Sequence, residues 1–168
     1  EYYLTGCVSN NQPISSHQGV GVYTSPEVGN GPTNNDLIAL NHADSPRTLT
    51  FSKLGVPVSV ENLFFAIVSM NKNGYLFDQN FRIVSSADSV SDSGYWGYSV
   101  PATITNNGNG QFGITTPSTF PNEFHGVLAI ENALESLTWN SQADEFWNGF
   151  TIGTYGRAQS ATVGGNVL

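Results

Sequence analysis

The sequence predicts an all-β protein, folded as an antiparallel β-sandwich of jelly-roll type. Short segments of alternating apolar and polar residues recur along the chain, and clusters of Gly, Pro, Asn and Ser separate them. β-Branched and aromatic residues are common in these segments, whereas no window of helical length has the i, i+3, i+4, i+7 spacing of an amphipathic helix. Many short strands separated by turn signals are typical of sandwiches and jelly rolls.

Length and composition indicate a single secreted domain spanning residues 1–168. A chain of 168 residues can bury a hydrophobic core without disulfides or metals. Its 5 Lys and Arg residues against 13 Asp and Glu residues give a net charge of -8, which argues against nucleic acids and anionic membranes as partners. Only 11% of the residues are charged, so uncharged polar side chains must cover the surface, and we expect an extracellular or cell-surface protein. We expect no membrane span, because no apolar run is long enough.

The first part of the chain alternates weak strand patterns with turns. We expect strands at residues 1–8, 19–23, 37–41 and 48–51, and a turn-rich loop at residues 25–35, where Pro, Gly and Asn are frequent. Because residues 1–8 lie at an end of the sequence, they form either an edge strand or a mobile arm.

The most apolar segment, residues 58–69, predicts a central strand. It is short and rich in β-branched and aromatic residues, which favours a strand over a helix. Residues 71–74 (Asn-Lys-Asn-Gly) predict a tight turn, because Asn and Gly tolerate a positive φ. Residues 75–84 continue beyond the turn, so the pattern predicts a β-hairpin between 58–69 and 75–84.

Further strands are expected at residues 102–105 and 111–115, and three more between residues 124 and 153. In this last block Leu137 and Trp139 share one face of a strand, which is the period-2 pattern of a sheet with one dry face. Because the block is rich in large aromatic residues, we expect it to hold much of the core.

No catalytic or zinc-binding motif stands out in the sequence. His17, His42 and His125 are far apart, and no Gly-x-Ser-x-Gly or Cys-x-x-Cys sequence occurs. A glycosidase would need two carboxylates flanking a cleft. We expect the acidic residues of the last block to be solvated turn carboxylates instead, because exposed Glu and Asp are the norm, and so we expect no enzyme. These acidic residues are Glu123, Glu131, Glu135, Asp144 and Glu145.

Calcium is the metal that the loop composition favours. Loops rich in Asn and Asp offer the oxygen ligands that Ca²⁺ prefers, although the ordered Asp-x-Asp-x-Asp-Gly spacing is missing. The alternative is that these residues cap the backbone of their own turns. The candidate ligands are Asp36, Asp44, Asp78, Asp88 and Asp92.

Three aromatic residues, Tyr95, Trp96 and Tyr98, lie close together after a polar loop. Exposed Trp and Tyr rings complement the apolar face of a sugar, so this segment is a candidate glycan-binding platform. The alternative is that alternate members of the run face the core, because Trp is usually well buried.

The two ends of the chain are candidate assembly segments. Residues 1–8 and 158–168 predict extended arms without an obvious hairpin partner, and an unpaired strand can complete the sheet of another subunit. The alternatives are disorder or pairing within the same chain. Cys7, the lone cysteine, is either a small buried hydrophobe or one half of an intermolecular bridge. The candidate assembly residues are Glu1, Tyr2, Tyr3, Leu4, Cys7, Val163, Val167 and Leu168.

Five stretches carry a family resemblance. They are residues 63–69, 77–81, 124–127, 137–140 (Leu-Thr-Trp-Asn) and 145–153 (Glu-Phe-Trp-Asn-Gly-Phe-Thr-Ile-Gly). In this order they resemble secreted bacterial β-proteins of the PEP-CTERM, exosortase-associated kind, and the last two are similar to the closing strands of that group. The resemblance implies export, a β-sandwich and a place at the cell surface or in the extracellular matrix. The sorting tail of the group does not occur in these residues; it has been removed, or the chain belongs to a different branch.

The sequence therefore favours a non-catalytic extracellular subunit of a surface layer, matrix or filament. We expect a homo-oligomer or polymer that assembles by strand exchange through its ends. The alternative is a carbohydrate-binding, lectin-like module assisted by calcium.

Overall fold

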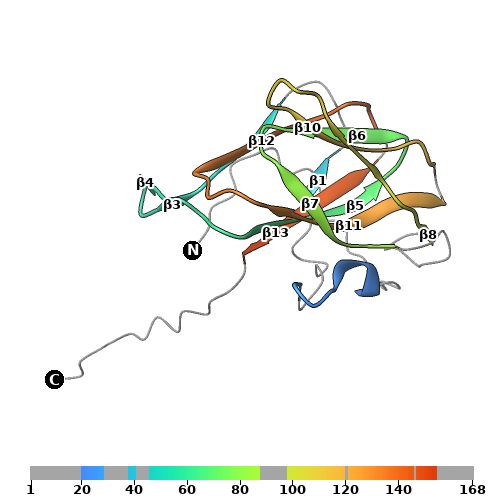
Figure 1. Ribbon diagram of the computed structural model, residues 1–168, viewed down its shortest axis with the longest axis horizontal. Helices are drawn as coiled ribbons and strands as arrows, with labels where there is room; N and C mark the ends of the chain where they lie inside the picture. The colour runs from blue at the N-terminus through green and yellow to red at the C-terminus, as the bar shows by residue number, and fades with distance from the viewer. Residues whose placement is uncertain are drawn as a thin grey trace.

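A computed structural model of the chain describes residues 20–28, 38–40, 46–87, 98–119, 121–145 and 147–154. Within these residues the protein is all-β apart from one short 3₁₀ turn, η1 (Val20–Tyr23). The strands form two layers that face each other, and a small hairpin projects from one end (Figure 1). The expected antiparallel β-sandwich is confirmed. In the described ranges no helix has the length and hydrophobicity needed to cross a membrane.

The first layer is a six-stranded sheet in the order β1-β13-β5-β11-β7, with β8 pairing beside β11. Its strands are β1 (Ile38–Leu40), β5 (Leu63–Met70), β7 (Phe81–Ser86), β8 (Tyr98–Ser99), β11 (Asn122–Ile130) and β13 (Asn148–Thr154). The second layer is a five-stranded sheet in the order β2-β12-β6-β10-β9. Its strands are β2 (Arg47–Thr50), β6 (Asn73–Phe77), β9 (Thr103–Asn106), β10 (Phe112–Thr116) and β12 (Ser136–Ser141). The projecting hairpin pairs β3 (Ser52–Lys53) with β4 (Val56–Pro57).

The strand pairing is that of a jelly roll. β1 pairs with β13, β2 with β12, β5 with β11 and β6 with β10, all antiparallel, so early strands meet late ones as in one long folded ribbon. β5 also pairs with β13, and β6 with β12, which rolls the ribbon into two sheets. β7, β8 and β9 are inserted between β6 and β10 and extend the sheet margins. Within this pattern β8 and β11 are parallel.

The expected hairpin between residues 58–69 and 75–84 is wrong. β5 and β6 belong to different sheets, and Ser69 (φ 62°) and Lys72 (φ 44°) turn the chain from one layer to the other. Gly74 lies inside β6, where an added Cβ would be 2.6 Å from Thr115 Cγ2. That glycine therefore permits close packing of β6 against β10 and makes no tight turn. Residues 19–23, expected as a strand, contain η1 instead.

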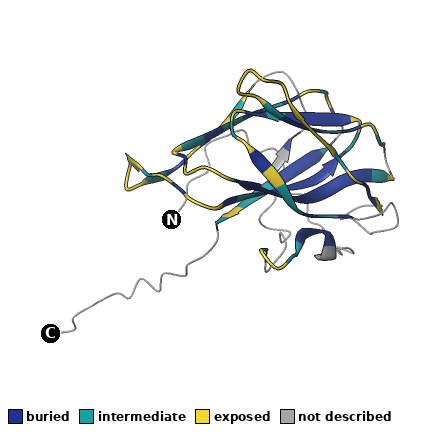
Figure 2. Cartoon of the chain, viewed as in Figure 1, coloured by how far each residue is buried: buried dark blue, intermediate teal, exposed yellow. Residues whose placement is uncertain are grey.

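The core lies between the two sheets, whose facing strands are largely buried (Figure 2). Large aromatic side chains pack against one another there. Phe65 stacks on Phe150 with ring centroids 4.9 Å apart and meets Trp139 edge-on at 5.1 Å. Such pairs add to the stabilisation from burial itself. Trp139 and Phe150 come from the last block of the chain, as expected from its aromatic content.

A second apolar cluster covers the outer face of the six-stranded sheet. Val22 and Tyr23 of η1 pack there against Val68 and Val127. The central strand β5 is consequently buried on both faces, which explains why residues 63–70 are almost continuously apolar.

Candidate functional site

Most of the candidate residues from the sequence lie outside the described ranges. They are Tyr95 and Trp96; Asp36, Asp44, Asp88 and Asp92; and Glu1, Tyr2, Tyr3, Leu4, Cys7, Val163, Val167 and Leu168. Tyr98 is described and is 49% exposed on β8. Asp78 is also described, and its Oδ1 accepts the Thr138 backbone N–H of β12 at 3.0 Å, so this bond links it to another strand and does not cap its own turn. No group of three or more His, Cys, Asp or Glu side chains in the described ranges is arranged to hold a metal ion.

Two of the acidic residues expected in solvent are buried instead. Glu123, at the start of β11, is 3% exposed, and Glu145, between β12 and β13, is 8% exposed. The expectation of solvated carboxylates is therefore wrong for this pair, while Glu131, Glu135 and Asp144 are exposed. Isolated buried carboxylates are costly, so the pair must have bonding partners.

Asn71 supplies the link between the two carboxyl groups. Its Nδ2 donates to Glu145 Oε2 at 2.7 Å and to Glu123 Oε1 at 3.4 Å, and its backbone N–H donates to Glu145 Oε2 at 2.9 Å. A side-chain amide nitrogen carries two hydrogens, so one can serve each carboxyl group. The turn from β5 to β6 thereby lies between the two acids.

The other two carboxyl oxygens also have donors from the protein. Ser69 Oγ donates to Glu123 Oε2 at 2.5 Å, and Asn73 Nδ2 donates to Glu145 Oε1 at 2.6 Å. All four oxygens of Glu123 and Glu145 therefore accept hydrogen bonds from neighbouring side chains or backbone. A fully bonded polar network of this kind rigidifies the segments that it joins.

His125 extends the network to η1. Its Nδ1 accepts the Ser69 backbone N–H at 3.2 Å and lies 2.7 Å from the Tyr23 hydroxyl oxygen. Because Nδ1 accepts a backbone N–H, the ring proton of the neutral imidazole is on Nε2. That nitrogen lies 3.6 Å from Glu123 Oε2, at ion-pair distance but without a hydrogen bond. We name Tyr23, Ser69, Asn71, Asn73, Glu123, His125 and Glu145 the carboxyl cluster.

Burial raises the pKa of Glu145 to about 7. Loss of hydration is the main cause, the bonds from Asn73 and Asn71 oppose it, and the nearby charge of Glu123 adds to it. Tyr75, on the neighbouring strand β6, has its pKa raised mainly by burial and secondly by the charge of Glu145. Glu145 therefore changes its protonation close to neutral pH.

The sequence contained a partial signal for the carboxyl cluster. Glu123 and His125 are two residues apart on one strand, so their side chains point to the same face of β11. Glu145 and Asn71 come close to Glu123 and His125 only because the folded chain brings distant strands together. No spacing in the sequence indicates that contact.

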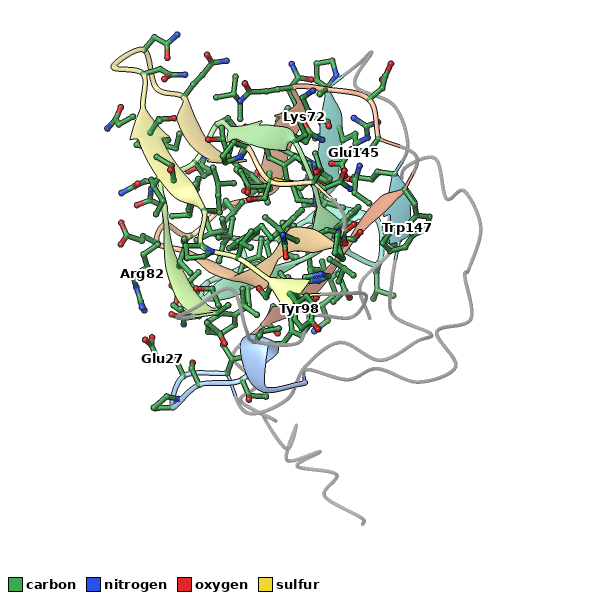
Figure 3. The ribbon with its side chains drawn as sticks, turned by 90° about the vertical axis from the view of Figure 1, so that its right-hand side faces the viewer. Glu27, Lys72, Arg82, Tyr98, Glu145 and Trp147 are labelled. Carbon is green, nitrogen blue, oxygen red and sulfur yellow. The ribbon has the colours of Figure 1, made fainter. Side chains whose placement is uncertain are left out.

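A second feature lies at the margin of the five-stranded sheet, where β9 is the last strand among the residues that the structure describes. All four residues of β9 are exposed, and Ile104 is 46% exposed. No Asp, Glu, Lys or Arg occurs between Asp92 and Glu123, so the strand and the chain segments on either side of it are uncharged. By contrast, the margin strand β7 of the other sheet carries Arg82, which binds Glu27 in a surface ion pair (Figure 3).

The backbone of β9 presents hydrogen-bonding groups on its outer side. The Asn107 N–H donates to Gln111 O at 3.1 Å, next to the β9–β10 ladder. Because antiparallel pairs alternate, Thr103 and Thr105 then bond to β10, while the N–H and C=O groups of Ile104 and Asn106 point outward. We call this row of outward groups the β9 edge. Such a row is a template for pairing with another strand.

The fold and these two features define a jelly-roll sandwich with a closed polar interior at one site and an open sheet edge at another. The sequence matches no protein-family model, and comparisons with curated proteins and with solved structures give no significant match.

Proposed function

We propose that the protein is a non-catalytic structural subunit of an extracellular layer, matrix or filament, and that it assembles by pairing strands at sheet edges. The observation that carries this proposal is the exposed and uncharged β9 edge. Natural β-proteins usually protect edge strands with charged residues, proline or bulges, because an open edge recruits other strands. The strand Thr103–Asn106 contains no charged residue and no proline.

The bonding of the carboxyl cluster supports a structural role over a catalytic one. A carboxyl pair that catalyses glycoside hydrolysis must reach the substrate, with one group holding a transferable proton. Glu123 and Glu145 are buried, and their oxygens are bonded to Ser69, Asn71 and Asn73. The low charge content and the resemblance to secreted β-proteins support a location outside the cell.

Growth of a layer or filament requires more than one contact per subunit. The β9 edge supplies one, and we propose that residues 1–8 or 158–168 supply another by adding a strand to a neighbouring subunit. Calcium bound by the Asp-rich loops is a further candidate at these contacts.

Electron microscopy and light scattering of the purified chain, in calcium and in chelator, test this function. We expect ordered polymers, and we expect deletion of residues 1–8 to stop their growth while the variant keeps its β-sheet circular dichroism. Polymers that dissolve in chelator would support calcium at the contacts. A monomer in both conditions at high protein concentration would contradict the proposal.

A second candidate is glycan binding, which the exposure of Tyr98 favours. Its half-exposed ring is available for stacking on a sugar, as expected for a member of the aromatic platform. A Tyr98→Ala variant should lose binding on a glycan array without loss of fold. Absence of binding by the unaltered chain would remove this candidate.

A further inference from the structure

We infer that the partner of the β9 edge is the β9 edge of a second copy of this chain, related by a two-fold axis that passes beside Thr105. The inference rests on the proposed function and adds to it the partner and the register of pairing. A two-fold contact requires a surface that is complementary to itself. The hydrogen-bonding groups, the side chains and the charge of β9 each meet that requirement.

The hydrogen-bonding groups of the β9 edge match their own copy. Ile104 and Asn106 point their N–H and C=O groups outward, and these residues have the spacing of successive bonded positions in an antiparallel ladder. When two copies run antiparallel, Ile104 of one copy exchanges both backbone bonds with Asn106 of the other. Thr105 then lies opposite Thr105 of the second copy, in a non-hydrogen-bonded pair.

The side chains of β9 also suit a second copy. Ile104 is paired with Ile114, a core residue, so it points toward the core side of the sheet, yet it is 46% exposed. A strand added beside β9 would cover part of that side chain. On the other face, Thr105 would meet Thr105, and Thr–Thr is a favourable cross-strand pair.

Charge permits this contact in spite of the overall repulsion between copies. Each chain carries -8, but the segment from residue 93 to residue 122 has no charged residue. The other edge strand of the same sheet, β2, begins with Arg47, and the edge strand β7 contains Arg82. Of the edge strands β2, β7 and β9, only β9 lacks a charged residue. Pairing of two copies through β9 therefore involves the least charge repulsion and the least desolvation of charged groups.

Disulfide trapping tests the partner and the register together. In a Cys7→Ser background, a Thr105→Cys variant should form a covalent dimer upon mild oxidation. A non-hydrogen-bonded antiparallel pair has Cα atoms about 4.5 Å apart, within the range that a disulfide spans. The matched control is Ile104→Cys, one residue away. In the inferred register, residue 104 of one copy lies diagonally across from residue 104 of the other, about 7–8 Å away. The cross-linked fraction on a non-reducing gel should therefore be several-fold lower than for Thr105→Cys.

An edge variant supplies the second measurement. Ile104→Lys places a charge on each copy at the contact, and we expect it to dissociate the dimer in light scattering while circular dichroism stays unchanged. If that variant fails to fold, the cysteine pair still decides the question. Deletion of residues 1–8 or 158–168 should leave Thr105→Cys cross-linking unchanged. Cross-linking that appears only after one of these deletions would show that a terminal segment occupies β9 in the intact chain and would overturn the inference.

The outcomes separate this inference from the proposed function. Assembly of the full chain without Thr105→Cys cross-linking, or with equal cross-linking of Ile104→Cys, would overturn the two-fold pairing alone. Covalent dimers that never form larger assemblies would support the pairing and contradict the layer or filament. A chain that remains monomeric would overturn both.

Discussion

The carboxyl cluster and the β9 edge use polar groups in opposite ways. In the cluster, Glu123 and Glu145 are buried, and every carboxyl oxygen accepts a bond from within the chain. At the edge, the backbone groups of Ile104 and Asn106 face outward from an exposed strand. Polar groups that are satisfied internally hold a fold in one arrangement, whereas polar groups left at an edge are available to a partner. Changes in the cluster should therefore alter stability, and changes at the edge should alter assembly.

The largest effect on stability is expected from Asn71→Ala. The variant removes the amide between the two buried acids and leaves Glu123 Oε1 without its donor, while the backbone N–H of residue 71 still serves Glu145 Oε2. Because unsatisfied buried groups cost about 1–3 kcal/mol each, and more when charged, we expect a loss of about 3 kcal/mol in the free energy of unfolding at pH 8. Urea titration measures this loss. The matched control, Asn107→Ala at an exposed turn position, should stay within about 0.5 kcal/mol. Equal effects of the two variants would contradict the bonding described for the cluster.

The next largest expected effect is that the free energy of unfolding depends on pH because of Glu145. The folded state holds the Glu145 proton more tightly than the unfolded chain, with a pKa of about 7 against 4.5. Its contribution is therefore fully present below pH 4.5 and is lost as the pH rises through 7. At about 1.4 kcal/mol per pKa unit, we expect this group to remove about 2 kcal/mol between pH 5 and pH 8.

Urea titrations of the unaltered chain and of Glu145→Gln at both pH values isolate that contribution. Other carboxyl groups titrate in both proteins, so the difference between the two pH slopes reports Glu145. The Gln variant should lack the loss. Identical slopes would show that Glu145 keeps an ordinary pKa in the folded state.

A smaller effect is expected where the cluster meets η1. Tyr23→Phe removes the hydroxyl beside His125 Nδ1, while the Ser69 N–H still donates to that nitrogen. One lost hydrogen bond between neutral groups should cost about 1 kcal/mol in a urea titration. A cost near zero would mean that the Tyr23 hydroxyl contributes nothing to holding η1 in place.

The smallest effect on stability is expected at the β9 edge itself. Ile104→Lys changes a half-exposed side chain on a strand that Thr103 and Thr105 hold to β10, so the unfolding free energy of the dissociated chain should shift by less than about 0.5 kcal/mol. Light scattering of the same sample should nevertheless report loss of assembly. A large loss of stability would place Ile104 in the core and remove the contrast between the two regions.

The sequence predicted the fold class because the alternation of apolar residues is a local property. It placed Leu137 and Trp139 on one face, and both are buried. It did not predict the partners of β5 and β6, because the same alternation fits a hairpin and two strands of facing sheets. The carboxyl cluster was missed for a related reason. Glu145 and Asn71 are distant in the chain, and only the jelly-roll crossing brings them together.

Quenched hydrogen exchange of backbone amides, read out by NMR at low and high protein concentration, tests most directly whether the carboxyl cluster is bonded internally and the β9 edge is bonded only in the assembly. The Asn71 amide, which bonds to Glu145, should be protected at both concentrations. The Ile104 and Asn106 amides should exchange freely in dilute protein and become protected in the assembled state. If these two amides exchange equally fast at both concentrations while light scattering reports assembly, the β9 edge is not the contact.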